Sequence, residues 1–315
     1  MQLRRADDVP SIFREVFDLV KGDRRSLEGE GAAYYFRGEG WNFESPGSIM
    51  PMTISPEPGL FRGYLEHESD IFNEAIRTFP QQFQNDRTTF EKLARMQHYG
   101  YKTRLLDVSP KITTALAMIL QPGSKGEEHL EETGFIHVYR VKEERIKYST
   151  GDTVTALANL ARIKEDHVRL DDLSYLAYEC KNERAGFHWE RKGERENDRL
   201  NVSEKLDNDI GKVWCVRPVI GNPRMDFQVG EFFLWGCGDR KTKLEATFDE
   251  TDYCNKDAAT YGIARIGVVA ISPEAKKEAK HFEVNLDIGL ERIYPDFHYH
   301  SQVINERFFN HGKQS

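Results

Sequence analysis

The sequence lacks an excess of basic residues, long apolar runs and paired cysteines, and each absence excludes a class of protein. Its 315 residues carry 44 Lys and Arg against 52 Asp and Glu, which gives a formal net charge of −8. This balance excludes a broad electrostatic footprint on duplex nucleic acid, because such a footprint needs a basic face. It does not exclude a local basic pocket for a nucleotide.

The apolar segments and the cysteines point to the cytoplasm. The longest apolar run, IGVVAI at 266–271, is far too short to span a bilayer. The opening MQLRRADDVP has no apolar core and predicts no signal peptide. The cysteines show no C-x-x-C spacing, which favours reduced thiols over disulfides or a zinc site; they are Cys180, Cys215, Cys237 and Cys254. We therefore expect a cytoplasmic protein with no membrane partner.

Hydrophobic periodicity predicts an α+β fold in a single domain, 1–315. The expected helices show apolar residues at helical spacing and cover 11–22, 64–79, 87–98, 110–121 and a segment after Ser272-Pro273. The expected strands are rich in β-branched and aromatic residues and cover 32–38, 103–108, 135–141, 212–220, 227–235, 243–248 and 262–271. Residues 142–210 are polar with helical spacing, and we expect them to form a helical insertion on this core.

The phrase YYFRGEGW at 34–41 places Arg37 at the end of an aromatic strand. An unpaired buried guanidinium is costly, so Arg37 must pair with an acidic residue or bind an anion such as a phosphate. Both interpretations stay open. Gly38 would let a ligand approach the backbone closely. In the related phrase PGLFRG, an ordinary ion pair is the simpler interpretation of Arg62.

The segment QHYGYKTRLLDVS at 97–109 is the densest polar and aromatic cluster of the chain. His98 and Tyr99 stand beside aromatic rings that would stack on a base-like ring. Ser109 precedes Pro110 at an expected helix start, where backbone N–H groups attract anions. The alternative is that Asp107 and Ser109 are only capping groups.

The segment NPRMDFQVGEFFLWG at 222–236 offers Gln228 and Glu231 in a strand. Strand alternation puts them on opposite faces unless a bulge at Gly230 brings them together. The alternative is an edge strand with a solvated carboxylate. His298 and His300 lack a metal-ligand pattern, so no metal is expected.

These stretches together resemble the FRG-domain proteins of bacteria and phages. That family has an aromatic-Arg-Gly strand, a second Leu-Phe-Arg, a Gln-His-Tyr-Gly block and an Arg-x-x-x-Gln-x-Gly strand, and all four occur here in order. Its core is similar to the split β-sheet of ADP-ribosyltransferases. The resemblance implies an enzyme that uses NAD to modify RNA, DNA or protein, with RNA favoured, as a toxin or anti-phage effector. It also implies a neutralising antitoxin partner.

The resemblance assigns roles to the residues above. The residues implied to bind NAD are Arg37, Gly38, Tyr99, Thr103, Arg104, Asp107 and Ser109. The residues implied to be catalytic are His98, Gln228 and Glu231. Transferases of this fold usually carry Glu or Gln two residues before the catalytic Glu, whereas this chain has Gly230 between Gln228 and Glu231. The alternatives are an NAD glycohydrolase on the same site and a non-enzymatic module that binds a nucleotide or nucleic acid.

Overall fold

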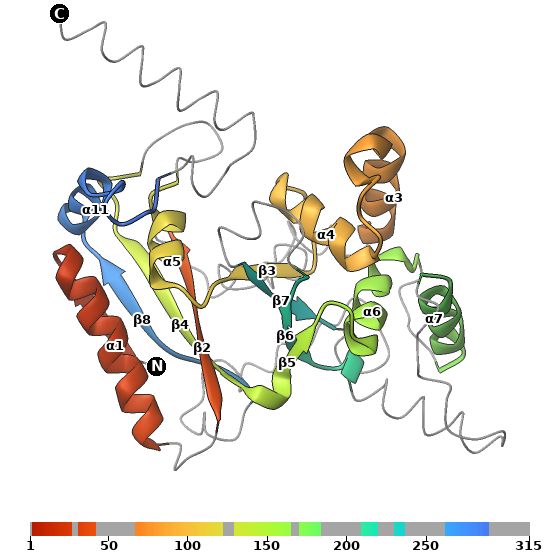
Figure 1. Cartoon of the computed structure of the whole chain (residues 1–315), viewed down its shortest axis with the longest axis horizontal. Helices are drawn as coiled ribbons and strands as arrows, with labels where there is room; N and C mark the ends of the chain where they lie inside the picture. Colours follow the sequence, from red (N-terminus) through yellow and green to blue (C-terminus); the bar gives the residue numbers. More distant parts are fainter. Residues whose placement is uncertain are drawn as a thin grey trace, which may run out of the picture.

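The computed structural model describes residues 2–26, 31–41, 67–121, 129–164, 170–183, 209–219, 230–236 and 262–289. The described residues form two four-stranded mixed sheets with helices packed around them, which is the predicted α+β class (Figure 1). Sheet A has the strand order β1 (Gln2–Ala6), β8 (Ile263–Ile271), β4 (Gly134–Lys142) and β2 (Ala32–Glu39). Sheet B has the order β3 (Leu105–Val108), β7 (Glu231–Trp235), β6 (Val213–Arg217) and β5 (Ile146–Tyr148).

The helices fall into two groups, one beside each sheet (Figure 1). The first group comprises α1 (Val9–Ser26), α5 (Ile112–Ile119) and α11 (Pro273–His281). The second comprises α3 (Glu68–Thr78), α4 (Thr89–His98), α6 (Asp152–Asn159) and α7 (Leu170–Glu183). Short 3₁₀ turns complete the described elements, namely η2 (Pro80–Phe83), η3 (Glu143–Arg145) and η4 (Leu160–Arg162). None of the described helices is long and apolar enough to cross a membrane.

Three apolar clusters hold these layers together, as expected when each sheet must bury a face. One cluster packs α1, α5 and α11 on what we call the outer face of sheet A. A second packs sheet B against α3, α4, α6 and α7. The third lies between the two sheets and includes Tyr35, Tyr139, Cys215 and Phe233. The inner face of sheet A, which carries Tyr35, therefore looks toward sheet B.

Local sequence explains where several helices begin. Thr88 and Glu91 form a reciprocal capping box at the start of α4, and the Ser272 hydroxyl caps α11 just before Pro273. The start of α5 differs from the prediction. The helix begins at Ile112, and the Ser109 hydroxyl accepts from Lys111 N at 3.1 Å. Ser109 therefore closes a tight turn ahead of the helix and is not its N-cap.

The segment 142–210 is more than a polar insertion where the structure describes it. Its strand β5 pairs in parallel with β6 and so belongs to sheet B. Every residue from Thr153 to Asn159 of α6 is buried, and α6 packs in the same apolar cluster as α4. This part of the segment therefore belongs to the core, contrary to the prediction.

Candidate functional site at the junction of the two sheets

The two sheets meet where β2 and β3 form an isolated antiparallel bridge. Phe36 N donates to Ser109 O at 2.7 Å, and Ser109 N donates to Phe36 O at 2.9 Å. In an antiparallel pair the next residue of one strand lies beside the previous residue of the other, so Arg37 lies beside Val108. Val108 pairs in turn with Glu231, the first residue of β7. The predicted anion-binding arginine and the predicted carboxylate therefore flank one residue of β3.

The Arg37 guanidinium makes two contacts with the described residues. Its Nη1 donates to the main-chain carbonyl of Asp107 at 3.0 Å. Its Nε lies 3.6 Å from Glu39 Oε1, which is beyond hydrogen-bond length, and has no hydrogen-bond partner. The side chain is 21% exposed. Arg37 thus has an acidic neighbour, yet it keeps solvent access and N–H groups beyond these two contacts.

A chain of polar side chains continues from Arg37 across the inner face of sheet A. Arg37 and Glu39 share this face, and His137 of β4 lies directly opposite Arg37. His137 Nε2 is 3.1 Å from Glu39 Oε2, and His137 Nδ1 is 3.3 Å from Nη1 of Arg265 on β8. Since arginine has no acceptor, Nδ1 accepts from Arg265, and Nε2–H donates to Glu39. The imidazole in this arrangement is neutral.

The surroundings of His137 favour that neutral form. Burial lowers the pKa of His137, and the positive charges of Arg265 and Arg37 lower it further, against the opposing effect of Glu39. The cluster of Arg37, Glu39, His137 and Arg265 therefore holds two guanidinium charges and one carboxylate charge at neutral pH.

Glu231 lies across β3 in a cluster that links the two sheets. Its side chain accepts from Arg217 Nε at 3.2 Å and from the Cys215 thiol at 3.4 Å, and Arg217 Nη2 donates to the Tyr35 hydroxyl at 3.2 Å. Burial raises the pKa of Tyr35 and of Cys215, so both stay protonated at neutral pH. Glu231 is 8% exposed, but the Arg217 side chain is 40% exposed. The pair therefore reaches solvent only through Arg217, and a ligand that displaced Arg217 would have to compensate a nearly buried carboxylate.

The other predicted residues of segment 97–109 divide between a polar link and a ring pair. Thr103 Oγ1 donates to Gln97 Oε1 at 2.8 Å, and Gln97 Nε2 donates to Asp107 Oδ2 at 3.0 Å. Asp107 therefore directs its carboxylate to α4 and its carbonyl to Arg37. The rings of His98 and Tyr99 meet edge to face at 4.9 Å, and Tyr99 is 55% exposed. This ring pair lies at the end of α4, separated from Arg37 by the link between Gln97 and Asp107.

Arg104 does not fit its predicted role as an NAD ligand. Its side chain is completely buried and forms a bidentate pair with Glu68, with Nε 2.8 Å from Oε1. Its Nη1 donates to the Trp235 carbonyl at 3.0 Å. A guanidinium with its donors used in this way ties α3 to β3 and β7, so Arg104 is a structural residue.

Gly38 also serves packing. A Cβ at this position would lie 1.8 Å from the carbonyl oxygen of Ala115, and one at Gly40 would lie 2.9 Å from that of Ile119. The backbone of α5 therefore fills the space beside Gly38 on the outer face of β2 and beside Gly40 just after the strand. Gly38 was predicted to admit a ligand, but on this face it allows α5 to pack closely against β2.

Some predicted residues lie outside the described part of the chain. They are Gln228, Arg62, His298 and His300. Among the described residues, no group of three or more His, Cys, Asp or Glu side chains is arranged to hold a metal ion.

Sequence reasoning missed three members of the cluster on sheet A, namely Glu39, His137 and Arg265. Glu39 carried a signal, because strand alternation puts it on the same face as Arg37. Arg265 interrupts the apolar strand GIARIGVVAI, and His137 is one of two basic residues in FIHVYRV. Their meeting depends on the pairing of β4 with β2 and β8, which the sequence does not reveal.

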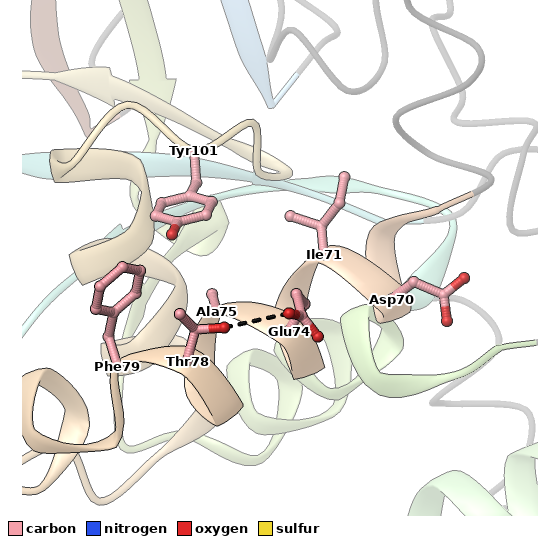
Figure 2. A pocket seen from close by; sticks show the side chains of 7 residues that line it. All are labelled: Asp70, Ile71, Glu74, Ala75, Thr78, Phe79 and Tyr101. Carbon is pink, nitrogen blue, oxygen red and sulfur yellow. Dashed lines mark hydrogen bonds between the residues drawn. The ribbon is translucent and has the colours of Figure 1, made fainter.

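A pocket on α3 lies apart from this junction. It has a volume of about 380 Å³ and is lined by Asp70, Ile71, Glu74, Ala75, Thr78, Phe79 and Tyr101. Figure 2 shows the Phe79 and Tyr101 rings at one end and the hydrogen bond from Thr78 to Glu74, 3.2 Å long, along the helix. No predicted site residue lines this pocket.

Comparisons with known proteins identify one region of the chain. Residues 32–127 match the model of the FRG domain, which confirms the resemblance drawn from the motifs. The matched stretch contains β2, β3 and the bridge between them, but it ends before Glu231. No curated protein and no solved structure matches the chain.

Proposed function

From the premise that the chain carries an FRG domain, we propose that the protein is an NAD-dependent ADP-ribosyltransferase. In this proposal it acts in the cytoplasm as a toxin or anti-phage effector, on an RNA, DNA or protein acceptor, under the control of a protein antitoxin. The observation that carries the proposal is the junction of the sheets, where Arg37 and Glu231 flank Val108 of β3.

The order of the strands supports an ADP-ribosyltransferase-like core. In that fold an arginine on a first strand, a Ser or Thr at a turn before a helix, and a carboxylate on a later strand surround the dinucleotide. Here Arg37 is on β2, Ser109 bridges to β2 ahead of α5, and Glu231 is on β7, which pairs with β3. These three residues come from two sheets that join at one bridge, and this arrangement supports the proposed split of the β-structure.

The chemistry at this junction follows from the charges. Arg37 would bind the diphosphate of NAD, a task that suits the planar fork of donors of a partly exposed guanidinium. Cleavage of the bond between nicotinamide and ribose passes through an oxocarbenium-like state, which a carboxylate at the ribose stabilises. Glu231 would supply that charge after Arg217 moves aside, with Gln228 as a second catalytic residue and the rings of His98 and Tyr99 near nicotinamide. Nicotinamide leaves with the bonding electrons, and the acceptor bonds to the ribose carbon and gives up a proton.

Incubation of the full chain with NAD labelled in the adenosine part tests the proposal. Label attached to RNA, DNA or protein supports the transferase. Free labelled ADP-ribose without attachment would indicate a glycohydrolase instead, and unchanged NAD would indicate a non-enzymatic binding module. Each acceptor is supplied separately, so that the class of acceptor is read from the same assay.

Three variants assign the roles. Arg37→Ala and Glu231→Gln should each lower kcat/KM by about 100-fold, the typical cost of losing one preorganised electrostatic contact. Arg14→Ala is the matched control, because Arg14 is an exposed arginine of α1 that pairs with its neighbour Glu15. Full turnover by Arg37→Ala would remove Arg37 from the site, and full turnover by Glu231→Gln would remove Glu231.

A further inference from the structure

The inner face of sheet A carries a second arginine beside the candidate site. Arg265 pairs in register with Tyr139 of β4, whose side chain lies in the cluster between the sheets. Its Nη1 reaches the His137 ring, which lies opposite Arg37 in the neighbouring pair of strands. Arg265 is partly exposed, and its Nε is buried without a hydrogen-bond partner. The two guanidinium groups thus lie on one face, and the contacts through His137 and Glu39 connect them.

The charges of this face do not balance among the described residues. Arg37 and Arg265 contribute two positive charges, Glu39 contributes one negative charge, and His137 is neutral. The carboxylate of Asp107 is directed to Gln97 on α4 and so does not neutralise this side. The described groups of sheet B nearest the junction, Glu231 and Arg217, pair with each other. An excess of positive charge on this largely buried face favours an anionic ligand, which guanidinium groups bind through charge-assisted hydrogen bonds.

We propose that Arg265 and Arg37 together form a two-guanidinium clamp for a diphosphate, one guanidinium to each phosphate, with Glu39 and His137 as positioning residues. This inference rests on the proposed function and extends it, because it names the second half of the anion site. His137 accepts from Arg265 on Nδ1 and donates to Glu39 through Nε2. Glu39 lies in turn beside Arg37 Nε. Glu39 and His137 therefore hold the two guanidinium groups in position relative to each other.

A clamp of this kind and a structural ion-pair network predict different effects of mutation on the affinity for ligands. A clamp selects ligands with two adjacent phosphates over ligands with one, because removal of either arginine removes contact with one phosphate. A purely structural network would change the stability of the fold and would weaken all ligands alike. The decisive quantity is therefore the ratio of affinities for ADP-ribose and AMP, which share the adenosine and one phosphate.

Calorimetric titration of the full chain with ADP-ribose and with AMP measures this ratio without any turnover. Arg265→Ala should weaken ADP-ribose binding by about 10- to 100-fold, the usual effect of one charge-assisted hydrogen-bonding partner, and AMP binding by much less. Arg265→Lys should recover part of the loss, since it restores the charge without the planar fork. Arg14→Ala is the control and should change neither affinity. Equal losses for both ligands, or no loss, would overturn the clamp.

Two further variants test His137 as a positioning residue. His137→Phe removes both hydrogen bonds and should weaken ADP-ribose binding nearly as much as Arg265→Ala. His137→Asn keeps one donor and one acceptor and should restore most of the affinity. Equal affinities in the two variants, with equal melting temperatures, would contradict the positioning role.

The clamp and the proposed reaction fail separately. If the wild type binds ADP-ribose with this pattern of variants but consumes no NAD, the clamp stands and the reaction falls. If the wild type consumes NAD and Arg265→Ala leaves both KM and ADP-ribose affinity unchanged, the reaction stands and the clamp falls. If the wild type binds neither ADP-ribose nor inorganic pyrophosphate, the clamp is wrong.

Discussion

Arg37 and Arg104 belong to the same matched region of the chain, yet they have opposite environments. Arg104 is fully buried, and Glu68 and the Trp235 carbonyl take its donors. Arg37 is partly exposed, and its acidic neighbour Glu39 stays at 3.6 Å. Strand position explains the difference, because Arg37 lies where the two sheets join and Arg104 lies where α3 covers sheet B. An arginine in a motif therefore becomes a candidate ligand only when the fold leaves its donors unused.

The largest expected loss of stability comes from breaking the ion pair between Arg104 and Glu68. Glu68→Gln or Arg104→Met should each lower the free energy of unfolding by about 3–5 kcal/mol, because each leaves a buried charge or its donors without a partner. Denaturation in urea measures the loss. The double variant Glu68→Met with Arg104→Met should be more stable than either single variant. Losses below about 1 kcal/mol in both single variants would refute the structural assignment of Arg104.

The next effect concerns Gly38, on the opposite face of β2 from Arg37. Gly38→Ala should cost about 1–3 kcal/mol or more, since the new methyl group overlaps the Ala115 carbonyl and α5 must move. Gly22→Ala is the control, because a Cβ there meets nothing within 4 Å and the residue lies inside α1. This control should gain roughly 0.5–1 kcal/mol. A tolerated Gly38→Ala would show that α5 packs less closely than described.

Arg37→Ala should have only a small effect on stability, in contrast to the Arg104 variants. We expect a loss of about 1 kcal/mol or less, since the guanidinium is partly exposed and makes one hydrogen bond to the described residues. Urea denaturation alongside the Arg104 variants gives the ratio of the two losses. A loss as large as that of Arg104→Met would make both arginines structural.

The smallest effect is a dependence of stability on pH that originates at His137. Its pKa in the folded state lies below the ordinary value of 6.5, so the unfolded chain takes up the proton first. Stability is therefore fully present above pH 6.5 and falls as the pH drops toward the folded pKa. His137→Asn should flatten the curve of unfolding free energy between pH 5 and pH 7, where wild type and variant are compared directly. Identical slopes would indicate that His137 titrates normally.

Local sequence signals predicted most elements that surround the site. The density of aromatic residues predicted β2. The capping residues Thr88 and Ser272 show that local sequence fixes where α4 and α11 begin. These features depend on neighbours along the chain. The residue Arg37 was identified for the same reason, because a charged side chain in an aromatic strand needs a partner.

What the sequence did not reveal depends on pairing between distant strands. The strand β1 has few apolar residues and owes its state to the parallel partner β8. The three residues of β5 likewise depend on β6. The same holds for the site, where His137 meets Arg265, and for the structural pair of Arg104 with Glu68, because both form only after helices and strands have packed. Gln228, which was predicted to lie on the same strand as Glu231, is outside the described part of the chain.

The pairing of β2 and β3 has a consequence for how the protein can be shortened. Both strands lie inside the matched segment 32–127, but their ladder partners β4 and β7 lie beyond it. A fragment cut at the borders of the sequence match would expose two bare strand edges, which invite aggregation. The unit recognised by similarity is thus smaller than the unit that folds, and any minimal version must retain at least Gly134–Lys142 and Glu231–Trp235.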